Sequence, residues 1–233
     1  MNEVLTHLTS GTLTVSGRLV DASNATLFAQ CEFEGETIDV IYKPVAGERP
    51  LWDFPDGNLA QREFAAFLIS SYAEWEIVPP TVLREGPFGI GMVQQWIEID
   101  DAIDLALFYR EDHAGLRRMA IFDAVINNTD RKIGHLLPSK SGHLYGCDHG
   151  VTFHEEYKLR TVLWQWADQP LTHDEILELR ELKSVIVSRR ERLFSLITES
   201  EYNALLSRID DLVESGVFPS PSEEWPAVPW PPF

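Results

Sequence analysis

The sequence is short of cysteine and of basic residues, and it contains no long apolar run. Two cysteines, Cys31 and Cys147, are too few and too far apart for a disulfide framework or a zinc ribbon. With 19 Lys and Arg residues against 37 Asp and Glu residues, the formal net charge is −18. A surface this acidic argues against nucleic acid or an anionic membrane as a partner. No run reaches the roughly 18 apolar residues of a membrane span.

The first residues have neither the basic nor the apolar segment of a secretory signal. Together with the two isolated cysteines, this favours a cytoplasmic protein with no membrane span. A chain of 233 residues is long enough for one large domain or for two small lobes with a substantial core.

The first part of the chain has the pattern of β-structure. Short β-branched runs at 12–20, 26–33 and 37–43, separated by turn residues at 21–24 and 34–36, predict a three-stranded meander. A loop follows, and helical spacing then predicts a helix from Leu59 to about Trp75 with Asn58 as its N-cap. Two further strands are expected at 81–84 and 92–97.

From about residue 101 the pattern becomes mostly helical. Helices are predicted at 116–127, 174–183, 189–196 and 200–215, with a short strand or hairpin at 142–147. We therefore expect an α+β protein with a β-rich N-lobe over 1–97 and an α-rich C-lobe over 98–233. The tail at 217–233 holds six of the fourteen prolines and two of the seven tryptophans. Trp225 and Trp230 either pack back onto the C-lobe or serve as a polyproline ligand.

At four sites, polar residues occupy positions that are not typical of a hydrophobic core. Lys43 ends a predicted strand, and Glu63 lies on the helix that follows. A strand Lys and a helix Glu form an ion pair that positions nucleotide phosphates in kinases, although a solvated strand end and a surface Glu explain each residue taken alone. Asp130 lies in the loop after a helix, His135 comes five residues later, and Asp148 precedes His149 and Gly150. Phosphoryl transfer needs a carboxylate to orient the attacking hydroxyl and hard oxygen ligands for a metal.

The order of these parts is that of a kinase, and the motifs make the resemblance specific. The run N-T-D-R at 128–131, with Asp148 downstream, resembles the catalytic segment of phosphatidylinositol 3/4-kinase-like proteins. The whole chain resembles an actinobacterial family of small proteins related to these kinases. The shared motifs are found at Tyr42–Pro44, Pro50–Pro55, Asn127–Leu136, Asp148–Phe153, Lys158–Trp164 and Trp225–Pro231.

The resemblance implies a two-lobed protein-kinase-like fold and a role for each matching residue. Lys43 would contact the phosphates of ATP and Glu63 would pair with Lys43; Asp130 would be the catalytic Asp, with Arg131 beside it. His135 and Asp148 would bind the metal, Mg²⁺ or Mn²⁺. The remaining implied nucleotide contacts are Ser23 and Asn24, in the turn over the phosphates, and Gln94, Gln95 and Trp96, beside the adenine.

Kinases of the phosphatidylinositol 3/4-kinase class have Asn where this chain has His135, and imidazole is a softer ligand that favours Mn²⁺ over Mg²⁺. If His135 only hydrogen-bonds within the loop, its replacement leaves the metal preference unchanged. As a metal ligand it must be neutral, which predicts weaker metal binding as the pH falls through about 6.5.

Residues 117–160 carry seven Lys or Arg against five Asp or Glu, so the expected phosphate site lies in a locally basic stretch. Candidates for phosphate or acceptor contacts are Arg131, Lys132, Lys158 and Arg160. The sequence thus predicts transfer of the γ-phosphoryl of ATP to a hydroxyl of a protein or small molecule. Two alternatives stay open: a catalytically silent nucleotide-binding protein acting through a partner, and a metal-dependent hydrolase using a histidine cluster with Asp148. Its histidines are His135, His143, His149 and His154.

Overall fold

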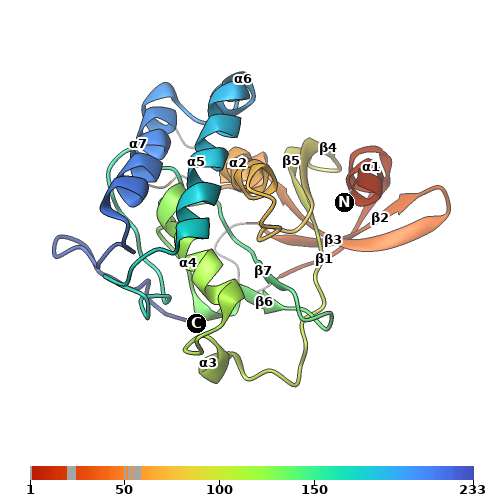
Figure 1. Ribbon diagram of the computed structural model, residues 1–233. Coiled ribbons are helices and arrows are strands. Elements are labelled where there is room, and N and C mark those ends of the chain that lie inside the picture. The colour runs from red at the N-terminus through yellow and green to blue at the C-terminus, as the bar shows by residue number, and fades with distance from the viewer. Residues whose placement is uncertain (1, 20–24, 50, 52–53, 55–58) are drawn as a thin grey trace.

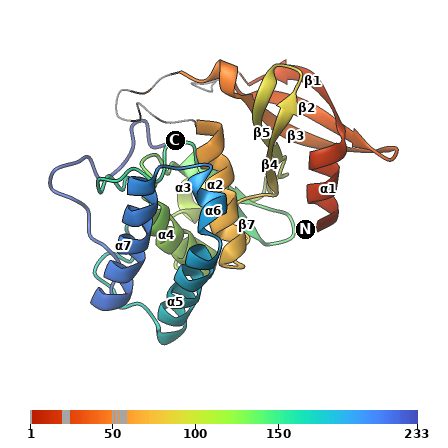
Figure 2. The ribbon, with the colours of Figure 1, turned by 90° about the horizontal axis from the view of Figure 1, so that it is seen from above.

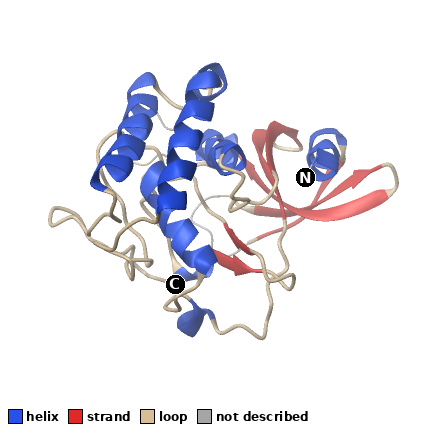
Figure 3. Ribbon diagram, in the orientation of Figure 1, coloured by secondary structure: helices blue, strands red, loops and turns tan. Residues whose placement is uncertain are grey.

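The computed structural model describes residues 2–19, 25–49, 51, 54 and 59–233. A five-stranded antiparallel sheet and helix α1 form one side of the molecule, and helices α4 to α7 form the other (Figures 1 and 3). The α+β class expected from the sequence is confirmed. None of the helices in the described part is both long and apolar enough to cross a membrane.

The sheet has the strand order β1-β2-β3-β5-β4. Its strands are β1 (Thr12–Arg18), β2 (Leu27–Phe33), β3 (Glu36–Pro44), β4 (Thr81–Gly86) and β5 (Gly89–Gln95). The predicted meander is confirmed, and its second turn uses Glu34 and Gly35 with φ of 52° and 85°. Positive φ at both central residues matches the right-handed twist of the flanking strands. Strand β3 is central, between β2 and β5.

The two faces of β3 have different surroundings because successive side chains point to opposite faces. Val40 and Tyr42 are fully buried in a small core with Val93 and with Leu8 of helix α1 (Asn2–Ser10). Helix α1 lies beside the sheet in Figure 2, and the sequence analysis did not anticipate it. Lys43 belongs to the opposite face of β3, together with Ile41.

Helix α2 (Leu59–Tyr72) lies between the sheet and the other helices (Figure 2). The predicted helix is confirmed, whereas its predicted N-cap, Asn58, is outside the described residues. The carboxylate of Glu48 accepts hydrogen bonds from the backbone amides of Leu59 (3.0 Å) and Ala60 (2.8 Å). Glu48, just after the 3₁₀ turn η1 (Val45–Gly47), therefore satisfies two donors of the first helical turn and places a negative charge at the positive end of the helix dipole.

The helical part confirms the predicted helices, with small differences at their ends. It contains α3 (Leu105–Phe108), α4 (Ala114–Ile126), α5 (His173–Ser188), α6 (Arg190–Phe194) and α7 (Glu199–Ser215). Reciprocal capping boxes start α5 at Thr172 and α7 at Thr198. Between α4 and α5 lie the 3₁₀ turn η2 (Ile133–His135) and the two-stranded ribbon of β6 (Leu136–Pro138) and β7 (Leu144–Gly146).

The larger hydrophobic core includes apolar side chains of α2 as well as α4, α5 and α7. Phe64 and Phe67 of α2 share this core with Phe122 and Leu182, so an element from the first 97 residues is packed into the helical part. The predicted boundary between two lobes at residue 97 stays a prediction, because the hydrophobic core is continuous across it.

The tail returns across the middle of the chain. The backbone amide of Thr161 and the indole N–H of Trp164 both donate to the carbonyl of Ala227, at 3.1 and 2.8 Å. The amide of Ile133 donates to the carbonyl of Pro232 at 2.8 Å. The expectation that the tail packs back is confirmed for these residues but is wrong for the Trp230 side chain, which is 88% exposed.

Candidate functional site

Lys43 connects three separate elements of the molecule. Its Nζ lies 2.5 Å from Oε1 of Glu63 on α2 and 2.7 Å from Oδ1 of Asp148, in the loop after β7. The Glu63 side chain is buried, and its Oε2 accepts a hydrogen bond from the amide of His149 at 3.0 Å. The structure thus brings together the strand Lys, the helix Glu and the loop Asp that the sequence predicted as one constellation.

Charge attraction fixes the protonation of this cluster. Burial alone would lower the pKa of Lys43, but Asp148 and Glu63 outweigh it and the pKa is raised. Lys43 in turn holds the pKa of Asp148 far below its usual range. Burial raises the pKa of Glu63, and the charge of Lys43 opposes that effect. Lys43 is therefore a cation and Asp148 an anion, and half of the Asp148 side chain faces solvent.

The loop that carries Asp130 begins at the end of α4. Asn127 has φ 52°, a left-handed conformation that ends the helix, and Asn128 Oδ1 accepts the amide of Asp130 at 3.0 Å. The Asp130 carboxylate is about one-third exposed at 31%, with Lys132 Nζ 3.4 Å away. Burial raises the pKa of Asp130, and Lys132 partly opposes this. A carboxyl group with these properties can accept a proton from a bound hydroxyl.

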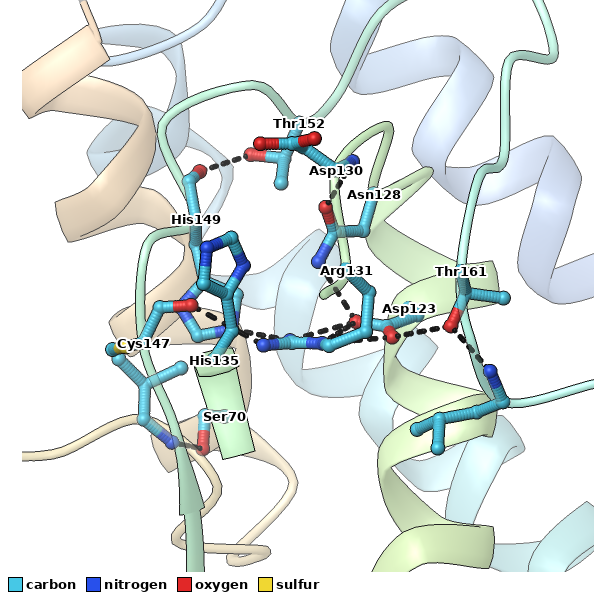
Figure 4. A network of polar contacts seen from close by, with 12 residues as sticks. Ser70, Asp123, Asn128, Asp130, Arg131, His135, Cys147, His149, Thr152 and Thr161 are labelled. Carbon is cyan, nitrogen blue, oxygen red and sulfur yellow. Dashed lines mark hydrogen bonds and ion pairs between the residues drawn. The ribbon is translucent and has the colours of Figure 1, made fainter. Parts of the chain in front are cut away.

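A closed polar network lies behind this loop (Figure 4). The guanidinium of Arg131 is fully buried and contacts both oxygens of Asp123 on α4, with Nη2 2.8 Å from Oδ1. The same Asp123 carboxylate accepts hydrogen bonds from the side-chain amide Nδ2 of Asn128 (2.9 Å) and the hydroxyl of Thr161 (3.3 Å). Arg131 Nη2 is also 2.7 Å from His149 Nε2, which accepts because a guanidinium only donates.

The placement of Arg131 corrects the expectation that it contacts phosphate or acceptor. Its side chain is 0% exposed, so it acts as a positioning residue that joins Asp123 to the carbonyl of Cys147 and the ring of His149, on either side of Asp148. Asp123 is the member that the sequence analysis missed. The signal was present: an Asp inside the apolar run from Phe122 to Ile126 needs a buried partner.

His135 lies beside Asp148, with Nε2 3.5 Å from Oδ2. The amide of Lys132 points at Nδ1 from 3.4 Å, which assigns the proton of the neutral ring to Nε2, facing the carboxylate. Burial, together with the charges of Arg131 and Lys132, lowers the pKa of His135 to about 4. The ring is therefore neutral near pH 6.5, and the titration expected there from the sequence is displaced to lower pH.

A cavity of about 380 Å³ opens next to these groups. Its polar wall includes Lys43, Glu63, Asp130 and Asp148, and Arg160 lies in the same wall. Its other described lining residues are Ala25, Pro44, Glu48, Arg49, Leu51, Phe54, Leu59, Ala60, Thr129, Gly150, Val151 and Trp225.

Five further residues are predicted to contact the nucleotide. Ser23 and Asn24 are outside the described residues. Gln94 is buried and donates to the hydroxyl of Thr81 at 2.9 Å, and Trp96 packs edge-on against Phe28 with ring centroids 5.3 Å apart. Neither side chain, nor that of Gln95, is among those lining the cavity. Their predicted contact with adenine stays a prediction.

The histidine cluster of the hydrolase alternative is not assembled. His149 faces Arg131, His143 Nε2 lies 2.9 Å from the carbonyl of Glu76, and His154 lies 3.2 Å from Lys158 Nζ. Over the described ranges, no group of three or more His, Cys, Asp or Glu residues could hold a metal ion.

Comparison with known proteins shows a relative in sequence and a likeness to solved structures. Protein Rv2133c of Mycobacterium tuberculosis is 40% identical over 262 residues, which cover 97% of this chain and 94% of that protein. The Helicobacter pylori proinflammatory kinase CtkA is 13% identical in a superposition with a TM-score of 0.47, covering 91% of this chain and 94% of that one. No protein-family model matches the chain.

Proposed function

This chain belongs to the same family as Protein Rv2133c of Mycobacterium tuberculosis, and from its site we propose that it is an ATP-dependent phosphotransferase with a two-lobed, kinase-like fold. The β-rich lobe would be 1–97 and the α-rich lobe 98–233. The observation that carries the proposal is the position of Lys43, whose Nζ contacts Glu63 and Asp148 at once.

A phosphotransferase needs a fixed cation for the nucleotide phosphates. The Lys43 side chain is 18% exposed and borders the cavity, while Glu63 anchors it from the buried side. A cation oriented in this way is already placed to meet a phosphate, so little ordering is required on binding. The structural alternative, a solvated strand end, does not account for two carboxylates converging on one ammonium group.

The reaction would transfer the γ-phosphoryl group of ATP to a hydroxyl. The hydroxyl oxygen forms a bond to the γ-phosphorus, the bond from that phosphorus to the β–γ bridging oxygen breaks, and ADP leaves with the electron pair. The hydroxyl proton passes to the carboxylate of Asp130, whose raised pKa favours holding it. The acceptor is a hydroxyl of a protein or of a small molecule.

A divalent metal fits the donor groups beside the cavity. Asp148 offers a hard, anionic and half-exposed oxygen ligand, and Mg²⁺ in such sites is held by one or two carboxylates together with phosphates and water. When bound, Mg²⁺ or Mn²⁺ would neutralise phosphate charge. His135 is the second predicted ligand; its Nε2 proton faces Asp148 in this tautomer, so ligation through Nε2 would require that proton to move to Nδ1.

His135 also motivates the second candidate, a catalytically silent nucleotide-binding protein that acts through a partner. If His135 keeps its proton on Nε2, Asp148 is the one ligand that remains of the predicted pair. Such a protein would bind nucleotide through Lys43 and would release no ADP with any acceptor.

Nucleotide binding is the direct test. We expect ATP with Mg²⁺ or Mn²⁺ to raise the thermal unfolding midpoint of the parent protein, and Lys43→Ala to lose most of that shift while remaining folded. Lys140→Ala is the matched control, because this Lys is 64% exposed and its ion pair among the described residues is with the exposed Glu98. Equal shifts in all three proteins would contradict the proposal.

A further inference from the structure

Arg160 is held rigidly beside the segment that carries Asp130. Its backbone amide donates to the carbonyl of Asn128 at 2.9 Å, and its own carbonyl accepts the amide of Arg131 at 3.1 Å. These two bonds fasten Arg160 on either side of Asp130. The Arg160 side chain lies in the wall of the cavity, and its charge acts on the Asp130 carboxylate.

The guanidinium of Arg160 has no carboxylate partner among the described residues, in a chain with a formal net charge of −18. Lys43 of the same wall contacts Glu63 and Asp148, Glu48 accepts from the start of α2, and Asp130 lies 3.4 Å from Lys132 Nζ. An unpaired guanidinium in a cavity is a ready binding group for phosphate or carboxylate, which it can contact through two parallel N–H donors.

Trp225 forms a neighbouring part of the cavity wall. Lys158 Nζ lies 5.0 Å from the centroid of its ring, and the tail around it is fixed by the hydrogen bonds to Ala227. With Phe54, Leu51 and Val151, Trp225 gives the cavity an apolar surface next to Arg160. A cavity of about 380 Å³ with apolar walls and a few polar groups has the size of a small-molecule site.

We infer that Arg160 and Trp225 form the acceptor subsite, and that the acceptor is a small alcohol bearing an anionic group, either carboxylate or phosphate. This inference rests on the proposed phosphotransferase. Arg160 is bonded through its backbone to the residues on both sides of Asp130, which receives the proton of the acceptor, whereas Lys43 lies on β3 and contacts Glu63 and Asp148. The anion recognised by Arg160 is therefore on the acceptor, and its hydroxyl reaches Asp130.

Calorimetric titration can test this with three probes that differ in charge. Glycerol 3-phosphate, glycerate and uncharged glycerol are titrated into the protein saturated with a non-hydrolysable ATP analogue and Mg²⁺. We expect at least one anionic probe to bind about tenfold more tightly than glycerol, as a charge-assisted contact provides. The phosphate and carboxylate probes distinguish the two sources of the anion.

Variants separate the acceptor from the nucleotide. Arg160→Gln should abolish the preference for anionic probes while leaving the dissociation constant of the ATP analogue within about twofold, and Arg160→Lys should keep part of the preference. Arg180→Gln on α5 removes the same charge from an exposed helix position and should change neither.

The outcomes distinguish a failure of the proposed phosphotransferase function from a failure of the proposed acceptor subsite alone. Failure of the parent protein to bind the ATP analogue overturns the proposed function and this inference with it. If the parent protein binds the analogue normally, three results overturn the inference alone. The anionic probes bind no better than glycerol, the preference survives in Arg160→Gln, or Arg160→Gln weakens the binding of the analogue as much as that of the probes. Phosphorylation of an acidic serine peptide with no binding of the small probes also overturns it.

Discussion

Two charged networks lie a few residues apart in this molecule, and they differ in their access to solvent. Around Lys43, one ammonium contacts two carboxylates, and Asp148 is half exposed at the edge of a cavity. Around Arg131, both the guanidinium and the Asp123 carboxylate are 0% exposed, and Asn128, His149 and Thr161 occupy the remaining polar atoms. The open network borders a cavity with room for a ligand, while the closed network holds in place the backbone that carries residues of the open network.

The comparison indicates that burial, and not charge, distinguishes the residues that position the backbone from the residues that can take part in chemistry. A fully buried ion pair has no water to replace a lost partner, so breaking it costs stability. A half-exposed carboxylate can exchange its partner for water or for a metal at much smaller cost. Substitutions in the closed network should therefore mainly lower the free energy of unfolding, whereas substitutions in the open network should mainly weaken ligand binding.

The largest effect is expected in the closed network. Asp123→Ala leaves the Arg131 guanidinium buried and unpaired, which should lower the free energy of unfolding by about 3–5 kcal/mol. Denaturant titration followed by circular dichroism measures this. The double variant Asp123→Ala with Arg131→Met should recover part of the loss, because no buried charge then remains. A loss below about 1 kcal/mol in the single variant would contradict the structural role.

The next effect is expected on rate. Asp130→Asn should keep nucleotide binding and reduce phosphoryl transfer by about 10²- to 10⁴-fold, the usual contribution of a general base. The pKa of Asp130 is raised, so the base form is lost at a higher pH than for an ordinary Asp near about 3.9. The acid limb of the rate profile should therefore lie above that value. A limb at the ordinary Asp value would argue against burial of this group.

Asp148→Asn is the counterpart of Asp123→Ala in the open network. We expect it to abolish metal-dependent nucleotide binding, since it removes the anionic oxygen ligand, and to leave the free energy of unfolding within about 1 kcal/mol of the parent. Lys43 retains Glu63 in this variant, which is why the fold tolerates it. Titrations of nucleotide with and without Mg²⁺, beside the same denaturant titrations, compare it with Asp123→Ala. A loss of several kcal/mol in the free energy of unfolding would show that Asp148 stabilises the fold as Asp123 does.

His135→Asn should have a smaller effect. With its Nε2 proton facing Asp148, the ring orients the carboxylate, so the ratio of Mn²⁺ to Mg²⁺ affinity should be unchanged while the rate falls by a few-fold. Metal titrations of parent and variant at neutral pH measure the ratio. A shift toward Mg²⁺ would restore His135 as a metal ligand, as the sequence had suggested.

The smallest expected effect concerns Glu48, which lines the cavity yet caps α2. Glu48→Gln should lower the free energy of unfolding by about 1 kcal/mol, because the amide is a weaker acceptor for the amides of Leu59 and Ala60 and carries no charge at the helix N-terminus. The thermal unfolding midpoint is sensitive enough to detect it. No change would mean that water replaces the cap.

Much of the fold was predictable from local pattern. The meander and helices α2, α4, α5 and α7 follow from alternation, from 3.6-residue periodicity and from caps such as Thr172 and Thr198. Helix α1 was missed because it is only nine residues long, and its apolar residues, Leu5 and Leu8 among them, span too few turns to establish a helical period. The order of Lys43, Glu63, Asp130 and Asp148 was readable because each is a charged residue in an unusual local context.

The rest of the site depends on long-range packing. The sequence gives Arg131 no sign that it is buried, because its partners Asp123, His149 and Cys147 are brought to it only by folding. The same holds for Glu48, whose acceptor role depends on how the loop after β3 returns to α2. Trp225 and Trp230 are identical in type and five residues apart, but the return path of the tail buries part of one and exposes the other.

The hydrogen bond between the amide of Ile133 and the carbonyl of Pro232 joins two positions that are synthesised far apart in time. While a ribosome is still adding the intervening hundred or so residues, Ile133, three residues after Asp130, has no backbone acceptor from the tail. The same delay applies to Thr161 and Ala227. The segment around Asp130 therefore reaches its final bonding pattern only after translation has passed residue 232, so a nascent chain stalled before that point holds the same candidate site residues without their last constraint.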